Sequence, residues 1–128
     1  FISAAAVADY RATEVASQKI KKKSDKMSLN LSKTPDIVSM LSKDNPKLFV
    51  VGFAAETDRV EAHAREKLEQ KNLNAIIAND VSRNDIGFNS DDNEALWIDA
   101  NNCKTLSKKS KMQLARELAV LIANEINH

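Results

Sequence analysis

Residues 48–53, LFVVGF, constrain the fold of this chain more than any other stretch. The run has no polar alternation, which is typical of a strand buried on both faces inside a parallel sheet. We therefore predict a central parallel strand over residues 47–54, a helix over 58–71 and a further strand over 73–78 (LNAIIA). Strand, helix and strand in this order form a βαβ unit, which is right-handed in nearly all proteins. The pattern predicts an α/β fold.

A second apolar run, residues 1–7, is also predicted to be a strand buried on both faces. Ligands of open parallel sheets bind beyond the carboxyl ends of the strands. Residues 52–57 and, by analogy, residues 5–9 should therefore lie on the ligand side and form a crevice. Asp9 is a carboxylate at one strand end, and the lysines of residues 19–23 follow it, so the region suits magnesium and phosphate groups. Two plainer interpretations stay open, in which the alanines serve helix–strand packing and the lysines are a solvated patch.

The segment after the first run is less regular. Residues 8–26 show weak periodicity and many polar side chains, and a segment of that length is either functional or mobile. Met27, Leu29 and Leu31 then alternate with polar residues, which predicts a half-buried strand.

Two helix starts are indicated by capping signals. Thr34 is predicted to be an N-cap, with Pro35 at the first helical position and Asp36 in the first turn. The free N–H groups at this helix start can hold a polar ligand group. Asp58 and Glu61 have the spacing of a capping box at the start of the next helix.

The charges of the 58–71 helix differ in how they are balanced within the helix. Arg65 has Glu61 one turn before it and Glu69 one turn after it, so it is predicted to be paired. Lys67 and Lys71 lie one turn apart and have no acid at the neighbouring helical positions, so they repel each other. A shared anionic partner would relieve this repulsion. The alternative is two solvated lysines near a helix end that favours cations.

The C-terminal part reads as a hairpin and a closing helix. Residues 79–93 are rich in turn formers, and residues 95–99 and 103–106 are predicted to be the two strands of the hairpin. Ser107 is predicted to cap the helix that follows. The apolar stripe expected on that helix consists of Leu114, Ala115, Leu118, Leu121, Ile122 and Ile126.

Composition excludes several classes of function. The net charge of +1 provides no field across the whole molecule for nucleic acid. The single cysteine, Cys103, excludes an internal disulfide and fits a reducing, cytoplasmic compartment. No apolar run reaches ~18 residues and no signal peptide is visible, so we expect no membrane segment. The two glycines, Gly52 and Gly87, cannot form a GxGxxG or Walker loop, so any such loop must lie upstream of Phe1, in a longer protein.

Six motifs occur in a specific order: AAAVADYR, KIKK beginning at Lys19, TPDIV, VVGFAAET, NLNAIIANDV and GFNSDDN. In this order they resemble bacterial phosphopantothenate–cysteine ligase, the synthetase half of the bifunctional coenzyme A biosynthesis protein. The resemblance covers residues 1–93, and the hairpin and helix after it are more generic. It implies a Rossmann-like parallel sheet flanked by helices, with a C-terminal β-hairpin and closing helix. Residues 1–128 would then be the C-terminal part of a single ligase domain, without the glycine-rich segment and the FMN-containing decarboxylase half.

The resemblance also implies a reaction. Enzymes of this family join 4′-phosphopantothenate to cysteine using CTP, and the carboxylate attacks the α-phosphate to give an acyl-cytidylate and pyrophosphate. The cysteine amine then attacks the acyl group and CMP leaves. The implied cofactor is Mg²⁺, and the implied partners are these small molecules, a second copy of the chain in a homodimer and the upstream segment, with no nucleic acid and no membrane.

The family's functional residues carry over by motif. The implied nucleotide contacts are Ser3, Ala4, Ala5, Asp9, Lys19, Pro35, Asp36, Ile37, Val38, Phe53, Lys67 and Lys71. Asp9 would bind the magnesium ion, and Phe53 would lie near the base. Lys19 would be the catalytic lysine on a mobile flap and would stabilise the acyl-phosphate in the second step. Asn79 and Asp80 match the family without an assigned role.

Two other classes of function remain open. A non-catalytic module could bind RNA or membrane lipid through residues 19–23, and its binding would depend steeply on salt. A Rossmann-type oxidoreductase needs a glycine-rich loop upstream and a Tyr-x-x-x-Lys motif, but Tyr10 is followed by Glu14 at that spacing. Fold alone does not separate these classes.

Overall fold

The predicted strand–helix–strand unit is formed by β4 (Val51–Glu56), α2 (Val60–Gln70) and β5 (Ala75–Asp80). In the computed structural model, which describes residues 1–22, 24–83, 85 and 90–127, β4 and β5 are parallel. Val51 lies opposite Ala75 and Glu56 lies opposite Asp80. β4 is flanked on both sides by other strands, so the prediction of an interior parallel strand is confirmed.

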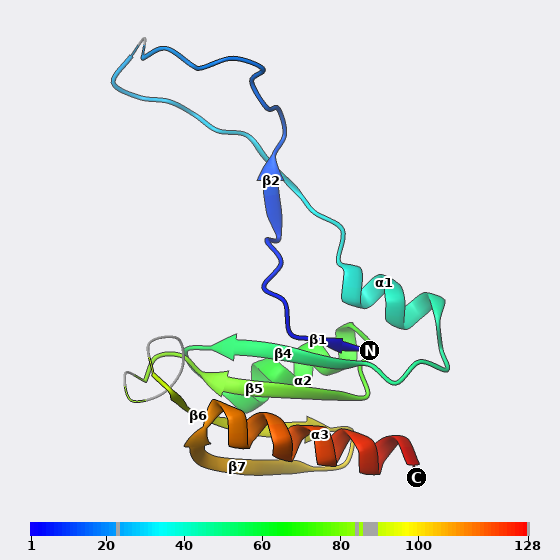
Figure 1. Ribbon diagram of the computed structural model, residues 1–128. Helices are drawn as coiled ribbons and strands as arrows, with labels where there is room; N and C mark the ends of the chain where they lie inside the picture. The colour runs from blue at the N-terminus through cyan, green and yellow to red at the C-terminus, as the bar shows by residue number, and fades with distance from the viewer. Residues whose placement is uncertain (23, 84, 86–89, 128) are drawn as a thin grey trace.

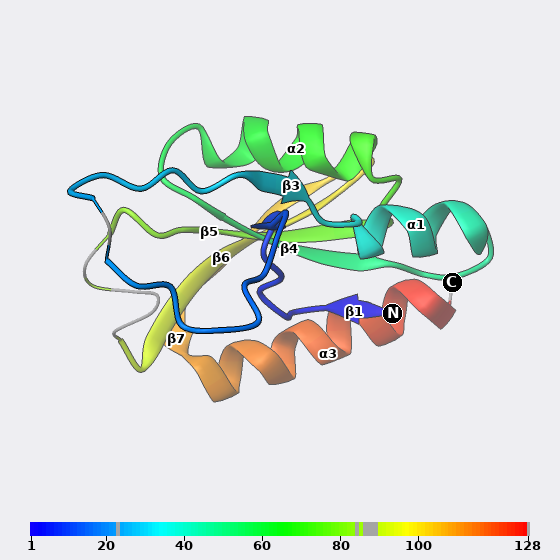
Figure 2. The same ribbon diagram turned by 90° about the horizontal axis from the view of Figure 1, so that it is seen from above.

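The main sheet has five strands in the order β1-β4-β5-β6-β7. β1 (Ile2–Ser3) pairs parallel with β4, whereas β6 (Asp92–Asp99) pairs antiparallel with β5 and with β7 (Cys103–Ser110). α2 lies on one face of this sheet and α3 (Lys111–Asn127) on the other (Figure 2). The α/β class and the C-terminal hairpin with its closing helix are therefore confirmed. None of the described helices has the length and apolar character that a membrane crossing requires.

Each face of the sheet has its own core because strand side chains alternate between the two faces. One core packs sheet residues, including Val51, Ile77 and Trp97, against α3. The α3 residues in it are Leu114, Leu118 and Ile122, with Leu121 partly buried, whereas Ala115 and Ile126 of the predicted stripe are exposed. The other core packs sheet residues such as Ala54 and Ile76 against Ala64 and Leu68 of α2.

A long arm projects from the body between β1 and the helix α1 (Ile37–Asp44) (Figure 1). Its lower part is a two-stranded ribbon in which β2 (Tyr10–Ala12) pairs antiparallel with β3 (Leu31–Lys33). The predicted half-buried strand is wrong, since of Met27, Leu29 and Leu31 only the last is in a strand and all three are exposed. The alternation is present, but these side chains are not packed against a second layer formed by the described residues.

The first predicted strand is also shorter and more exposed than expected. Only Ile2 and Ser3 are in β1, and Ile2 is 52% exposed. β1 is an edge strand, so it has a neighbour on one side only. Residues 4–7 leave the sheet and lead into the arm, which explains why this apolar run is not buried.

The two predicted caps at the first helices are wrong in position. α1 starts at Ile37 with Asp36 as its N-cap, and the Asp36 carboxylate accepts a hydrogen bond from the Ser39 amide at 3.0 Å. The Thr34 hydroxyl instead donates to the Ala8 carbonyl at 2.5 Å, across the base of the arm. The N-cap of α2 is Arg59 in a left-handed conformation with φ of 43°, without a side-chain cap.

α3 begins at Lys111, so Ser110, the last residue of β7, stands in the N-cap position, and the predicted cap at Ser107 is wrong. The Ser110 hydroxyl accepts a hydrogen bond from the backbone N–H of Gln113 at 3.3 Å. In return, the side-chain oxygen Oε1 of Gln113 accepts one from the backbone N–H of Ser110 at 3.3 Å. This reciprocal pair is a capping box with glutamine at its third position.

Candidate functional site

A cavity of about 1030 Å³ lies where β1 and β4 end. Every expected nucleotide contact except Lys19 lines it: Ser3, Ala4, Ala5, Asp9, Pro35, Asp36, Ile37, Val38, Phe53, Lys67 and Lys71. These residues come from β1 and the chain after it, from the start of α1, from β4 and from α2. The topology thus brings four separated segments to one edge of the sheet.

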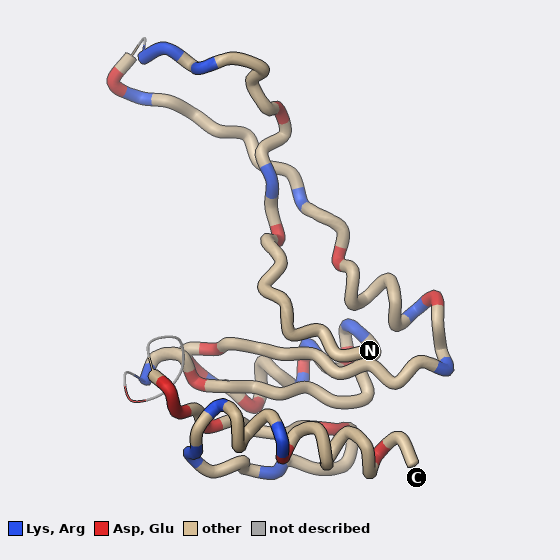
Figure 3. The backbone as a smooth tube through the Cα atoms, viewed as in Figure 1, with Lys and Arg blue, Asp and Glu red and all other residues tan. Residues whose placement is uncertain are grey.

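Lys19 is in a different place. It belongs to the segment that joins β2 to β3, which forms the far part of the arm (Figure 1), and it is exposed. Basic residues gather along this part of the arm (Figure 3). Asp9 and Phe53 share the cavity, whereas Lys19 does not line it within the described chain, although the resemblance implies that all three contact the nucleotide. Lys23, the last lysine of the cluster, lies outside the described residues.

Lys67 and Lys71 both have acidic partners, contrary to the expectation from helix spacing. Lys67 Nζ lies 2.6 Å from Glu56 Oε1, at the end of β4. Lys71 Nζ lies 3.0 Å from Asp36 Oδ2, at the start of α1. Both acids belong to other elements of the fold, so an argument from residue spacing within the helix cannot predict these pairs. Arg65 pairs with Glu61 at 2.9 Å as predicted.

Asp36 connects two parts of the cavity wall, the start of α1 and the end of α2. Its carboxylate caps α1 through Ser39 and also holds Lys71 of α2. Burial acts to raise the pKa of Asp36, but the Ser39 amide and the Lys71 ammonium lower it by more, so the pKa lies below its ordinary value. Asp36 is therefore an ionised anchor between α1 and α2.

Asp9 is the candidate magnesium ligand. It lines the cavity, but no group of three or more His, Cys, Asp or Glu side chains gathers around it or elsewhere in the described residues. Mg²⁺ commonly binds through one or two carboxylates and completes its shell with substrate phosphates and water. A lone aspartate fits that mode of binding.

His63 lies 3.7 Å from Glu56 and 3.9 Å from Asp58, so it has acidic neighbours. Among the described residues, however, it belongs to no group of three or more side chains that could hold a metal ion.

The β4 wall of the cavity is partly apolar. Phe53 is 43% exposed and offers an aromatic face on which a planar base can stack. The neighbouring Gly52 has no side chain, and a Cβ there would lie 2.8 Å from Leu73 Cδ1. Gly52 therefore allows Leu73 to pack closely beneath this wall.

Three further residues line the cavity, although the sequence analysis assigned none of them to the site. Asn79, at the end of β5, Asn93, at the start of β6, and Lys111, at the start of α3, line the same cavity. Asn79 follows the predicted strand over residues 73–78, lies within the observed β5, and matches the family without an assigned role. Asn93 and Lys111 line the cavity because β6 pairs with β5 and β7 leads into α3. Asp80 does not line it: its carboxylate accepts from the Ser82 hydroxyl at 2.6 Å and the Ser82 amide at 2.9 Å, and these bonds lower its pKa.

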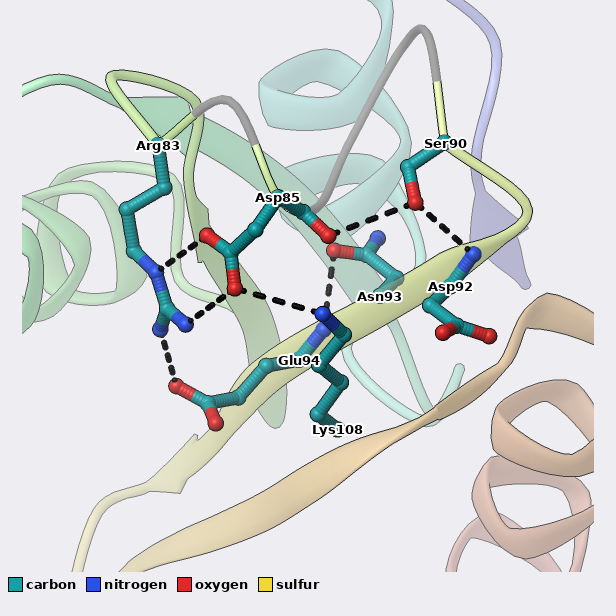
Figure 4. A network of polar contacts seen from close by, with 7 residues as sticks. All are labelled: Arg83, Asp85, Ser90, Asp92, Asn93, Glu94 and Lys108. Atoms are coloured by element: carbon teal, nitrogen blue, oxygen red, sulfur yellow. Dashed lines mark hydrogen bonds and ion pairs between the residues drawn. The ribbon is translucent and has the colours of Figure 1, made fainter.

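A polar network near Asn93 links Arg83 and Asp85 to Glu94 of β6 and Lys108 of β7 (Figure 4). Arg83 contacts Asp85 at 2.9 Å and Glu94 at 2.7 Å, and Lys108 of β7 contacts Asp85 at 3.3 Å. Arg83 first and then Lys108 hold the pKa of Asp85 at about 2. Residues 87–89 of the GFNSDDN motif lie outside the described residues.

Fold and cavity together define an α/β domain whose candidate site lies at the carboxyl ends of its parallel strands. The chain belongs to the family of DNA/pantothenate metabolism flavoprotein C-terminal domains, which it matches over residues 1–126. It is 52% identical over 119 residues to the coenzyme A biosynthesis bifunctional protein CoaBC of Haemophilus influenzae, and 48% identical over 116 residues to that of Escherichia coli K12.

The solved structures agree with this assignment. The crystal structure of the C-terminal domain of CoaBC matches with a TM-score of 0.73 at 31% identity, covering 96% of this chain and 52% of that one. The DNA/pantothenate metabolism flavoprotein of Streptococcus pneumoniae matches with a TM-score of 0.67 at 29% identity, covering 84% and 46%. The chain spans 30% of the length of the Haemophilus protein and 28% of the Escherichia protein.

Proposed function

We propose that this chain is part of a coenzyme A biosynthesis enzyme and forms the CTP-binding portion of a phosphopantothenate–cysteine ligase. The observation that carries the proposal is the cavity, because it gathers the expected nucleotide contacts, Lys19 excepted, at the carboxyl ends of β1 and β4. The similarity to CoaBC proteins supports the assignment to this pathway. The family resemblance also favours a cytoplasmic location.

The cavity offers suitable groups for each part of CTP. Lys67 and Lys71 supply ammonium groups for the phosphates, and the first backbone N–H groups of α1, at Ile37 and Val38, add donors without intrahelical partners. Phe53 supplies a stacking surface for the base. Asp9 would hold Mg²⁺, which when bound neutralises phosphate charge and polarises the α-phosphate.

The two chemical steps place different demands on these residues. In the first, the pantothenate carboxylate attacks the α-phosphate and pyrophosphate leaves, so cations near the phosphates stabilise the shifting charge. In the second, the cysteine amine attacks the acyl carbon and CMP leaves. We assign the stabilisation of this second step to Lys19.

For this role Lys19 must lie close to a nucleotide in the cavity, so the arm that carries Lys19 must bring it there. We propose that the protein is a homodimer in which the arm packs against a second copy. Apolar side chains of the arm are exposed, with Val15 88% and Met27 75% accessible, and an intermolecular contact would cover them.

A segment upstream of residue 1, and an FMN-containing decarboxylase half in the same protein, would complete the enzyme.

Calorimetry of CTP and of ATP, each with magnesium, tests the proposal on the full-length protein. CTP should bind more tightly than ATP, and turnover with 4′-phosphopantothenate and cysteine should release pyrophosphate and CMP. Equal affinity for the two nucleotides, or none, would count against a CTP-dependent ligase. Binding of RNA or anionic vesicles that weakens steeply with salt would favour the non-catalytic alternative.

A further inference from the structure

Glu56 is the last residue of β4 and lies behind the cavity wall. Its side chain is on the same face of the sheet as that of Ala54, two residues earlier, which packs in the core beneath α2. The Glu56 side chain is only 13% exposed, whereas that of Lys67 is 43% exposed. Lys67 lines the cavity and Glu56 does not.

The carboxylate of Glu56 contacts two side chains of α2 that lie one turn apart on the same face of the helix. Its Oε1 accepts a hydrogen bond from Lys67 Nζ at 2.6 Å, and its Oε2 lies 3.7 Å from His63 Nδ1. In the Glu56–Lys67 pair, the carboxylate is nearly buried and therefore fixed in place, whereas the ammonium group belongs to the residue that lines the cavity. A lysine ammonium has three N–H donors, so one bond to Glu56 leaves two for a ligand.

We propose that Glu56 is a positioning residue that holds the Lys67 ammonium at the cavity wall in the orientation that a phosphate group needs. The inference rests on the proposed binding of CTP. With Glu56 present, the Lys67 side chain is already ordered before the nucleotide binds. Without Glu56, binding itself must order this long side chain, which lowers the affinity for CTP by about three- to tenfold. Asp36 holds Lys71 in a similar way, but it lines the cavity itself, whereas Glu56 acts only through Lys67.

Two substitutions separate position from charge. Glu56→Asp keeps the negative charge but is one methylene shorter, so it withdraws the carboxylate from Lys67. Glu56→Gln removes the charge but leaves an oxygen that can accept from the ammonium. Calorimetry of CTP with magnesium on the full-length protein should give a dissociation constant about three- to tenfold higher for Glu56→Asp and a smaller rise for Glu56→Gln.

The coupling to Lys67 is the decisive readout, because a merely structural role would not produce it. Lys67→Ala should itself weaken CTP binding, and Glu56→Asp should cause no further loss in that background. Glu61→Asp is the matched control, since it shortens the acid of the Glu61–Arg65 pair on α2, at 2.9 Å, and neither residue lines the cavity. Its CTP affinity should equal that of the unaltered protein.

Two results would overturn the inference. One is a Glu56→Asp protein that binds CTP as tightly as the unaltered protein or more tightly, and the other is an equal loss with and without Lys67. A protein that binds no CTP before any substitution would refute the proposed function instead, and the role of Glu56 with it.

Discussion

Asp85 connects stability to pH at the scale of single residues. Its pKa is about 2 in the folded protein, against an ordinary value of 3.8, because Arg83 and then Lys108 stabilise the ionised form. A lowered folded-state pKa stabilises the fold above the ordinary pKa, and this contribution disappears as the pH falls through the folded-state value. We predict that Asp85→Asn lowers the melting temperature at pH 6 but not near pH 2, which thermal unfolding across that range measures.

Asp91→Asn provides the control for this experiment. Its carboxylate makes no hydrogen bond or ion pair to any residue that the structure describes, so its substitution should shift the melting temperature little at either pH. An Asp85→Asn protein with the same loss at both pH values would contradict the assignment of the effect to ionisation.

The strand pattern placed residues 5–9 and 52–57 on the ligand side, and the family resemblance named most of the individual residues of the cavity wall. Neither predicted the pairing of its charges. The partners of Lys67 and Lys71 could not be predicted, because Glu56 and Asp36 belong to other elements and meet these lysines only in the folded protein.

At the scale of elements, the start of α3 depends on Ser110. Its capping box with Gln113 satisfies amide groups that the helix leaves unpaired. We predict that Ser110→Ala destabilises the protein by about 1 kcal/mol, measured by chemical denaturation. The matched control is Ser107→Ala, because Ser107 is exposed within β7, and a larger loss there than at Ser110 would contradict the position of the cap.

Local signals predicted which elements exist better than where each one begins. The βαβ unit and the hairpin have strong apolar runs, so their burial follows directly. The starts of the helices were misplaced because several residues suited to capping stand close together, as Thr34 and Asp36 do, or Ser107 and Ser110. The choice between them depends on which contacts the rest of the fold makes, such as the bond from Thr34 to Ala8.

For the molecule as a whole, the segment that joins β2 to β3 and carries Lys19 projects away from the sheet (Figure 1), and Lys19 does not line the cavity. Met27 and Leu29 lie on the same arm and are exposed in the described structure, so their apolar alternation failed to predict burial. The position of Lys19 on the arm divides the proposed chemistry between two parts, with nucleotide contacts on the body and the proposed second-step lysine on the arm.

We predict that Lys19→Ala in the full-length protein leaves the CTP dissociation constant within about twofold of its original value and slows capture of the intermediate by cysteine. The physical reason is that Lys19 does not line the cavity that would hold the nucleotide. Acyl-cytidylate should accumulate in rapid-quench experiments, whereas normal turnover would remove Lys19 from the mechanism. Lys26→Ala is the control, because Lys26 is exposed on the same arm.

The central claim is that the cavity at the ends of β1 and β4 holds CTP, and a crystal structure of the full-length protein with CTP and magnesium tests it most directly. We predict that the base lies against Phe53, that the phosphates lie within hydrogen-bond distance of Lys67 and Lys71, and that Asp9 binds the metal ion. A nucleotide bound anywhere else, with this cavity free of it, would contradict the account.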